Sequence, residues 1–273
     1  MSELLNYLPL FLVLATLVTG VLWGHDRLRR RPQRLAAAAA LDERTPVAAR
    51  GPAYEKARAA LLADPPTMEW GGSFFPLLAV VLVVRSFLFE PFVIPSGSML
   101  PTLQIGDYIL VNKYRYGLRL PVLGTKVLSV GAPARGDVMV FYPPHLDVYY
   151  IKRVVGLPGD FIRYDNRTLF INGERVPLEA KGLDADGLER FLETLGPVTH
   201  EIQYEPSRGR NVQEWRVPAD AYLVFGDNRD RSADSRSWGY VPEANVIGQA
   251  VAIWMHKAPG LALPRFFRNG IIE

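Results

Sequence analysis

The sequence predicts an all-β domain that follows two N-terminal transmembrane helices. Three observations support this prediction: two long apolar runs near the N-terminus, a basic segment between them, and short apolar runs from residue 90 onward that are separated by Gly, Pro, Asn and Asp. The 273 residues are 49% apolar and 22% charged, which is typical of a chain with a buried core and excludes intrinsic disorder. The chain has no cysteine, so disulfides and thiol catalysis are excluded.

The first apolar run extends from Leu4 to Trp23 and contains no charged residue. About 20 helical residues cross a hydrocarbon core of about 30 Å, so we expect residues 1–23 to form the first transmembrane helix. A cleaved signal peptide is the alternative, because such peptides also carry an apolar stretch near the N-terminus. The residues before the run include Glu3 and no Lys or Arg, and the run is longer than a typical signal-peptide core, so a permanent anchor is favoured.

Residues 24–72 form a basic segment that holds nine Lys/Arg and six Asp/Glu and so accounts for the whole net charge of +3. Its densest part contains Arg27, Arg29, Arg30, Arg31 and Arg34. In a soluble protein such a cluster would suggest a nucleic-acid contact, but beside an apolar run it favours a cytoplasmic loop. We expect a solvated, partly helical loop with helical stretches at 36–41 and 57–62. The breaks are expected at its prolines, which are Pro32, Pro46, Pro52, Pro65 and Pro66.

The second apolar run covers residues 71–89 and is interrupted near its end by Arg85. An arginine near a helix end can extend its guanidinium to the headgroups, so we expect residues 73–89 to form the second transmembrane helix. The alternative is a buried core helix of a soluble domain. Because basic loops stay in the cytoplasm, residues 90–273 are expected to lie outside it.

The outer domain, residues 90–273, is expected to be built of strands. Five short apolar runs predict them at 108–111, 137–141, 148–155, 221–225 and 246–254. Asn172-Gly173 lies between two further runs and indicates a tight hairpin, because both residues tolerate positive φ. Residues 180–211 are polar and irregular, with a helical patch expected at 184–194, and we interpret them as an insertion or small cap on the β core.

A candidate nucleophile occurs shortly after the second apolar run. The G-x-S-x-G, S-x-x-K and glycine-rich phosphate motifs are absent, and the four histidines occur singly, so neither a metal nor another cofactor is expected. Between residues 90 and 103, three prolines and a glycine surround Ser96 and Ser98 and can hold them in one rigid loop. A loop of this composition is also consistent with a simple turn.

A serine nucleophile needs a base, and Lys152 is the best candidate among six lysines. It alone lies in a strongly apolar strand, at 148–156. Burial disfavours the ammonium form and can bring the pKa of a lysine toward neutrality, where the amine accepts a proton. The alternative is a lysine on the solvent-exposed face of a half-buried strand.

Four motifs, in this order, resemble those of the bacterial type I signal peptidases, membrane-bound serine proteases that remove signal peptides from exported preproteins. They are Pro95-Ser-Gly-Ser-Met-Leu-Pro-Thr102, Arg135-Gly-Asp-Val-Met-Val-Phe141, Tyr150-Ile-Lys-Arg-Val-Val-Gly-Leu-Pro-Gly-Asp160 and Gly226-Asp-Asn-Arg-Asp-Arg-Ser-Ala-Asp-Ser-Arg236. The resemblance covers most of residues 1–257. It implies a signal-peptidase-like β fold in a bacterial inner membrane, crossed twice, with the catalytic domain on the periplasmic side.

The resemblance also implies roles for individual residues. Ser98 would be the nucleophile and Lys152 the general base of a Ser/Lys dyad that works through an acyl-enzyme. The Ser98 backbone N–H and the Ser96 hydroxyl would stabilise the oxyanion, and Ser232 would orient the lysine. The charged residues around Ser232 would support the site structurally: Asp227, Arg229, Asp230, Asp234 and Arg236. Arg231 departs from the family pattern, which often has a small polar residue there.

The family cleaves after an Ala-x-Ala-like pattern, so small apolar substrate pockets are expected. The residues expected to line them are Phe92, Ile94, Met99, Leu103, Tyr150 and Ile151, with the substrate added as a strand near 92–96 and 148–152. The expected partners are preprotein signal peptides and membrane lipid, and neither nucleic acid nor a metal. Two alternatives remain, a cytosolic self-cleaving Ser/Lys regulator of the repressor type and an inactive membrane-anchored scaffold.

Overall fold

The computed structural model describes residues 8–121, 124–206, 212–258 and 260–273. The chain divides into two compact units, a helical unit that runs to Arg85 and a β-rich unit made of Ser86–Leu120 and Thr125–Glu273. The boundary between them falls close to the end of the second apolar run.

The first helical stretch of the helical unit continues through the basic cluster. It consists of α2 (Leu8–His25), a π-helical turn η1 (Asp26–Arg30) and α3 (Arg31–Arg44). The expected break at Pro32 is wrong. Pro32 lies in the first turn of α3, directly after the π turn, where the missing N–H is tolerated.

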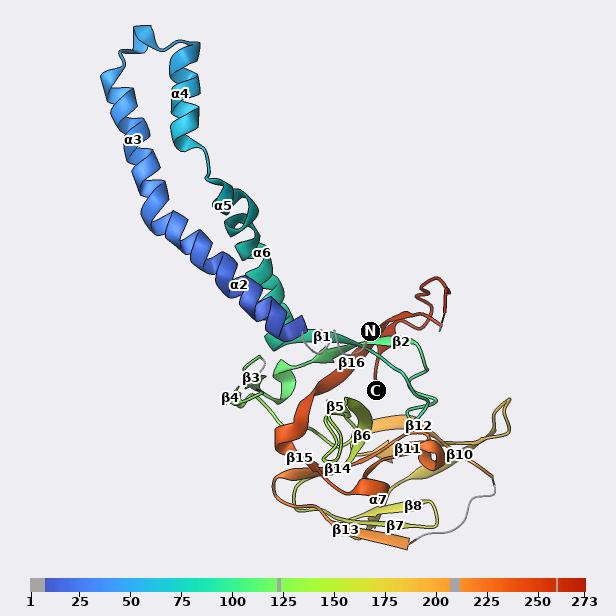
Figure 1. Ribbon diagram of the computed structural model, residues 1–273. Coiled ribbons are helices and arrows are strands. Elements are labelled where there is room, and N and C mark those ends of the chain that lie inside the picture. The colour runs from blue at the N-terminus through green and yellow to red at the C-terminus, as the bar shows by residue number, and fades with distance from the viewer. Residues whose placement is uncertain (1–7, 122–123, 207–211, 259) are drawn as a thin grey trace. The chain divides into compact units, whose positions relative to one another are not determined.

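The second helical stretch returns alongside the first (Figure 1). Its elements are η2 (Val47–Ala49), α4 (Pro52–Leu62), α5 (Pro66–Trp70), η3 (Gly72–Phe74), α6 (Phe75–Val83) and a π turn η4 (Val84–Leu88). Helix α2 packs on α6, with the Trp23 and Phe75 ring centroids 5.2 Å apart. The segments Leu8–Arg44 and Pro66–Leu88 are both long and apolar enough to cross a membrane, judged by length and composition.

The β-rich unit is organised around one antiparallel sheet. Its strands, in spatial order, are β1 (Phe89–Val93), β2 (Asp107–Asn112), β16 (Val246–His256), β5 (Val138–Phe141), β6 (Tyr150–Gly156), β14 (Ala221–Phe225) and β15 (Val241–Pro242), and β17 (Gly270–Ile271) pairs with β16. All five predicted strands are confirmed, with ends that differ by at most two residues. Strand β1 lies at the edge of this sheet.

Three smaller sheets complete the unit. They comprise β13 (Val212–Arg216), β7 (Phe161–Asp165), β8 (Thr168–Ile171) and β9 (Glu174–Arg175); β10 (Leu178–Leu183), β11 (Glu189–Leu195) and β12 (Val198–Tyr204); and β3 (Leu118–Arg119) with β4 (Lys126–Leu128). The short helical elements are η5 (Tyr114–Tyr116), η6 (Arg229–Arg231), α7 (Ser235–Trp238) and η7 (Glu243–Asn245). The Asn172-Gly173 hairpin is confirmed, with φ of 54° and 89° at its two turn residues.

The helix expected at residues 184–194 is wrong, because this segment forms a turn and strand β11. The Asp184 carboxylate accepts the backbone N–H groups of Asp186 and Leu188, both at 2.9 Å. Gly187 has φ of 76°, which suits glycine and ends any helical path. The part of residues 180–211 that the structure describes is therefore mostly regular sheet, and residues 207–211 lie outside it.

Candidate active site

Ser98 and Lys152 meet at the centre of the β-rich unit. Ser98 lies in the turn that follows β1, and Lys152 lies on β6 opposite Met139 of β5. Lys152 Nζ lies 2.6 Å from Ser98 Oγ and donates to the backbone oxygen of Ile151 at 2.8 Å. Both side chains are largely covered, since Ser98 is 9% exposed and Lys152 is 4% exposed. The structure thus brings the two predicted catalytic groups into hydrogen-bond distance.

The surroundings of Lys152 favour the neutral amine. Burial lowers the pKa of Lys152 from its usual value of 10.5 to about 8, although the carboxylates of Asp234 and Asp227 partly oppose this. About a tenth of the amine is therefore unprotonated at pH 7 and about half at pH 8, whereas a lysine with its usual pKa would be almost fully protonated at both. An unprotonated amine beside a hydroxyl can act as a general base.

The Ser98 loop is held by the loop that follows β14. The backbone N–H of Asn228 donates to the Ser98 carbonyl oxygen at 3.1 Å, and its side-chain amide donates to the Gly97 carbonyl oxygen at 2.9 Å. These contacts join residues from the first and last of the four motifs. They fix the backbone on both sides of the Ser98 peptide.

Gly226 allows Ser232 and Ser98 to approach the same backbone. A Cβ at position 226 would lie 2.2 Å from Ser232 Oγ and 2.5 Å from the Ser98 carbonyl oxygen. Ser232 Oγ is buried and makes no hydrogen bond to any residue that the structure describes. Its role in orienting Lys152 stays a prediction, as does the oxyanion role of Ser96, which is exposed on the Ser98 loop.

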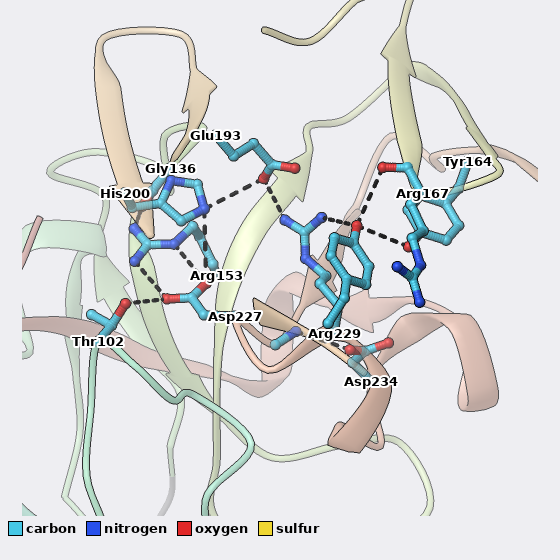
Figure 2. Close-up of polar contacts among 12 residues, drawn as sticks. Thr102, Gly136, Arg153, Tyr164, Arg167, Glu193, His200, Asp227, Arg229 and Asp234 are labelled. Atoms are coloured by element: carbon cyan, nitrogen blue, oxygen red, sulfur yellow. Dashed lines mark hydrogen bonds and ion pairs between the residues drawn. The ribbon is translucent and has the colours of Figure 1, made fainter. Parts of the chain in front are cut away.

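Two of the charged residues predicted to support the site, Asp227 and Arg229, form buried ion pairs (Figure 2). Arg153 binds both carboxylate oxygens of Asp227, at 2.9 and 2.8 Å, and both side chains are 1% exposed. Thr102 donates to the same carboxylate at 2.6 Å. Burial would raise the pKa of Asp227, but the charge and hydrogen bonds of Arg153 outweigh it and leave that pKa below its usual value.

A second set of contacts holds the far end of the same loop. Asp234 accepts the backbone N–H of Gly226 at 2.9 Å and pairs with Arg236 at 2.7 Å. Arg229 is buried and paired with Glu193 of β11. Asp230 accepts the backbone N–H of Glu205 at 2.8 Å.

Arg231, the departure from the family pattern, has a side chain that is 60% exposed and pairs with Glu205 at 2.6 Å. Its side chain therefore faces solvent at the rim of the site. In this position it does not enter the buried ion pairs that surround the dyad.

The six residues predicted to bind substrate divide into two groups. Phe92, Tyr150 and Ile151 are half-buried and so have surface available for contact. Ile94, Met99 and Leu103 are instead fully buried in one apolar cluster. The turn after β1 folds these three side chains under the Ser98 loop, so they are not exposed beside the dyad residues, and their part in a substrate pocket stays a prediction.

Sequence reasoning missed several residues that hold the site, namely Thr102, Arg153, Glu193 and Asn228, and it also missed His200, which is buried beside two of the carboxylates. Of these residues, Arg153 could have been identified from the sequence, because it follows Lys152 in the apolar run of strand β6. A central strand is buried on both faces, so a charge within it must have a partner. The partner itself, Asp227, lies 74 residues away.

The comparisons with known proteins identify the family of the chain. Residues 67–255 match the family described as "Signal peptidase, peptidase S26". The chain is 49% identical to "Signal peptidase I" of Pseudomonas fluorescens and 47% identical to that of Pseudomonas aeruginosa PAO1, each time over 98% of this chain and 99% of the relative. It is 35% identical to "Signal peptidase I" of Haemophilus influenzae, over 93% of this chain and 87% of the relative. With matches over nearly its whole length, the chain belongs to the signal peptidase family, peptidase S26.

Proposed function

We propose that the protein is a membrane-bound serine endopeptidase that removes N-terminal signal peptides from exported preproteins through a Ser98/Lys152 dyad. The observation that carries the proposal is the 2.6 Å approach of a buried amine to a buried hydroxyl. A surface lysine would be protonated and could not accept the serine proton at neutral pH.

The proposed reaction has two steps at the same pair of atoms. Ser98 Oγ attacks the scissile carbonyl carbon while neutral Lys152 takes its proton and then passes it to the leaving amine. In the second step Lys152 activates a water molecule, which hydrolyses the acyl-enzyme and releases Ser98. The Ser98 N–H and the Ser96 hydroxyl are proposed as oxyanion donors, and loss of one such donor typically costs about 2.7–4 kcal/mol.

Two strand edges near Ser98 and Lys152 could pair with an extended substrate. Strand β1 has one paired edge, toward β2, among the described strands. On β6, residues 150–152 pair with β5, whereas β14 pairs only from Arg153 onward. A substrate strand that binds between these edges would place its backbone near Ser98 and its small side chains against Phe92, Tyr150 and Ile151, consistent with cleavage after an Ala-x-Ala-like pattern.

We further propose that the two apolar helices anchor the enzyme in the bacterial inner membrane. Residues 24–72 would lie in the cytoplasm and residues 90–273 on the periplasmic side, following the positive-inside rule. Exposed apolar side chains of the β-rich unit, such as Leu263, Phe266 and Phe267, would contact lipid. Tryptophan fluorescence that stays unchanged when vesicles are added to the protein would contradict this lipid contact.

The decisive experiment is incubation of the purified full-length protein with one preprotein, with the cleavage site mapped by mass spectrometry. S98A and K152A should each lose processing while remaining folded. The matched controls are S129A and K181A, since both positions are exposed and neither contacts the dyad. Cleavage retained by S98A or K152A would remove the dyad, and an inactive wild-type protein would favour a scaffold role.

A further inference from the structure

The three-stranded sheet β10–β12 directly contacts the loop that holds Ser98. The backbone N–H of Gln203 on β12 donates to the carbonyl oxygen of Asp227 at 2.9 Å, and Gln203 forms an isolated β-bridge with Asn228. Asn228 in turn holds the carbonyl oxygens of Gly97 and Ser98. Residues 180–211, which the sequence suggests are a peripheral insertion, therefore contact Asn228, the residue that holds the Ser98 turn.

His200 of β12 places its ring between two carboxylates in this region (Figure 2). Its Nε2 lies 3.4 Å from Glu193 Oε2 and 3.8 Å from Asp227 Oδ1. The side chain is 2% exposed, and neither ring nitrogen makes a hydrogen bond within the described residues. A buried polar group without a full partner has a desolvation cost, so its presence calls for a physical reason.

The two carboxylates belong to separate ion pairs. Asp227 pairs with Arg153, the neighbour of Lys152 on β6, and Glu193 of β11 pairs with Arg229 of η6. With a neutral ring, the four charges of these two ion pairs sum to zero. Without the ring, the two carboxylates would face each other across an apolar gap, and their repulsion would draw each one away from its arginine.

We propose that His200 is a positioning residue for the Ser98–Lys152 site, which keeps Asp227 on Arg153 and Glu193 on Arg229. This role rests on the proposed function. Through Asp227 and the adjoining Asn228, the ring fixes the Ser98 carbonyl relative to β6, on which Lys152 lies. The sheet β10–β12 thereby becomes part of the catalytic support.

The protonation state of the ring fits this role. Burial lowers the pKa of His200, as does the Arg153 charge, and these effects outweigh the opposing influence of Glu193 and Asp227. The ring is therefore neutral at neutral pH. A neutral ring that carries its proton on Nε2 places that N–H on the side of the two carboxylates, 3.4 and 3.8 Å away, where its dipole is attracted to their negative charge.

Three variants of the full-length protein test the proposal in the preprotein cleavage assay. H200F fills the space without an N–H, H200Q keeps an amide N–H at similar reach, and T199V changes the adjoining exposed residue of β12 as the matched control. We expect kcat of H200F to fall about 10- to 100-fold, with KM within about twofold of wild type, because misplacement of reacting groups affects the chemical step. H200Q should recover most of the loss, and T199V should resemble wild type.

The pH profile supplies a readout that a merely structural role would not move. The Asp227 carboxylate raises the pKa of Lys152, so displacement of Asp227 should move the acid limb of kcat/KM in H200F to lower pH. In H200Q that limb should stay at the wild-type position. A folded H200F with wild-type kcat and an unmoved limb would overturn the proposal, as would equal losses in H200F, H200Q and T199V.

If H200F does not fold, H200N takes its place, because the shorter amide cannot reach both carboxylates. The same loss of kcat and the same limb shift are then expected, and wild-type behaviour would overturn the proposal. Wild type and S98A are measured in the same assay. An inactive wild type would refute the proposed function, whereas an active wild type, an inactive S98A and an unaffected H200F would refute only the role of His200.

Discussion

Lys152 lies in an apolar strand, with its amine next to Ser98 Oγ and its pKa lowered by burial to about 8. Because the unprotonated amine is the proposed general base, kcat/KM should rise with pH below about 8, with a slope near one, and level off above it. Initial rates of preprotein cleavage between pH 6 and 10 check this. K152R should be inactive throughout, since a guanidinium stays protonated in this range. A flat wild-type profile would contradict the role of Lys152.

The two residues proposed for the reaction could be predicted from the sequence, whereas the residues that hold them in place could not. Ser98 and Lys152 were identified through motif resemblance, because 54 residues separate them and no local pattern relates the two. The partners of the buried charges were not predictable for the same reason. Arg229 pairs with Glu193 across 36 positions, and only the folded chain brings them together.

Strands and turns were predictable where local chemistry decides them. Asn172-Gly173 fixes its hairpin through two positive-φ residues, and the apolar runs of β5, β6 and β14 match the buried sheet. The helix expected at 184–194 failed because Asp184 caps its own turn and β12 pairs with the following residues along β11. Strand pairing of this kind overrides local helical propensity.

The packing of the loop after β14 against the Ser98 turn depends on the missing side chain of Gly226. In G226A the new methyl group would overlap Ser232 Oγ and the Ser98 carbonyl oxygen, so one of the two segments must move. We expect kcat/KM to fall about 100-fold or more, because Ser98, the proposed nucleophile, is displaced. The control is G270A, whose methyl group would meet no atom within 4 Å. Activity of G226A within about twofold of wild type would show that the close approach is unimportant.

The orientation proposed for the whole molecule can be tested cleanly because the chain has no cysteine. A48C lies in the basic segment and A180C on an exposed strand, and both replace an exposed alanine. In spheroplasts, a membrane-impermeant maleimide should label A180C directly and A48C only after the membrane is broken. Labelling of A48C from outside would reverse the proposed topology.

The buried amine also affects the stability of the whole fold. Since the pKa of Lys152 is lowered in the folded state, protonation favours the unfolded chain, at a cost of about 3 kcal/mol below pH 8 that fades as pH rises toward 10.5. K152M should therefore unfold at higher denaturant than wild type at pH 7, with a smaller difference at pH 10, as fluorescence-monitored melts would show. Equal midpoints at pH 7 would contradict it.

At position 152, the proposed need for a base therefore conflicts with the stability of the fold. A laboratory evolution screen for heat tolerance alone would discard this lysine early and yield robust but inert proteins. With Lys152 as the proposed base, the fold gives up stability at this position in exchange for turnover.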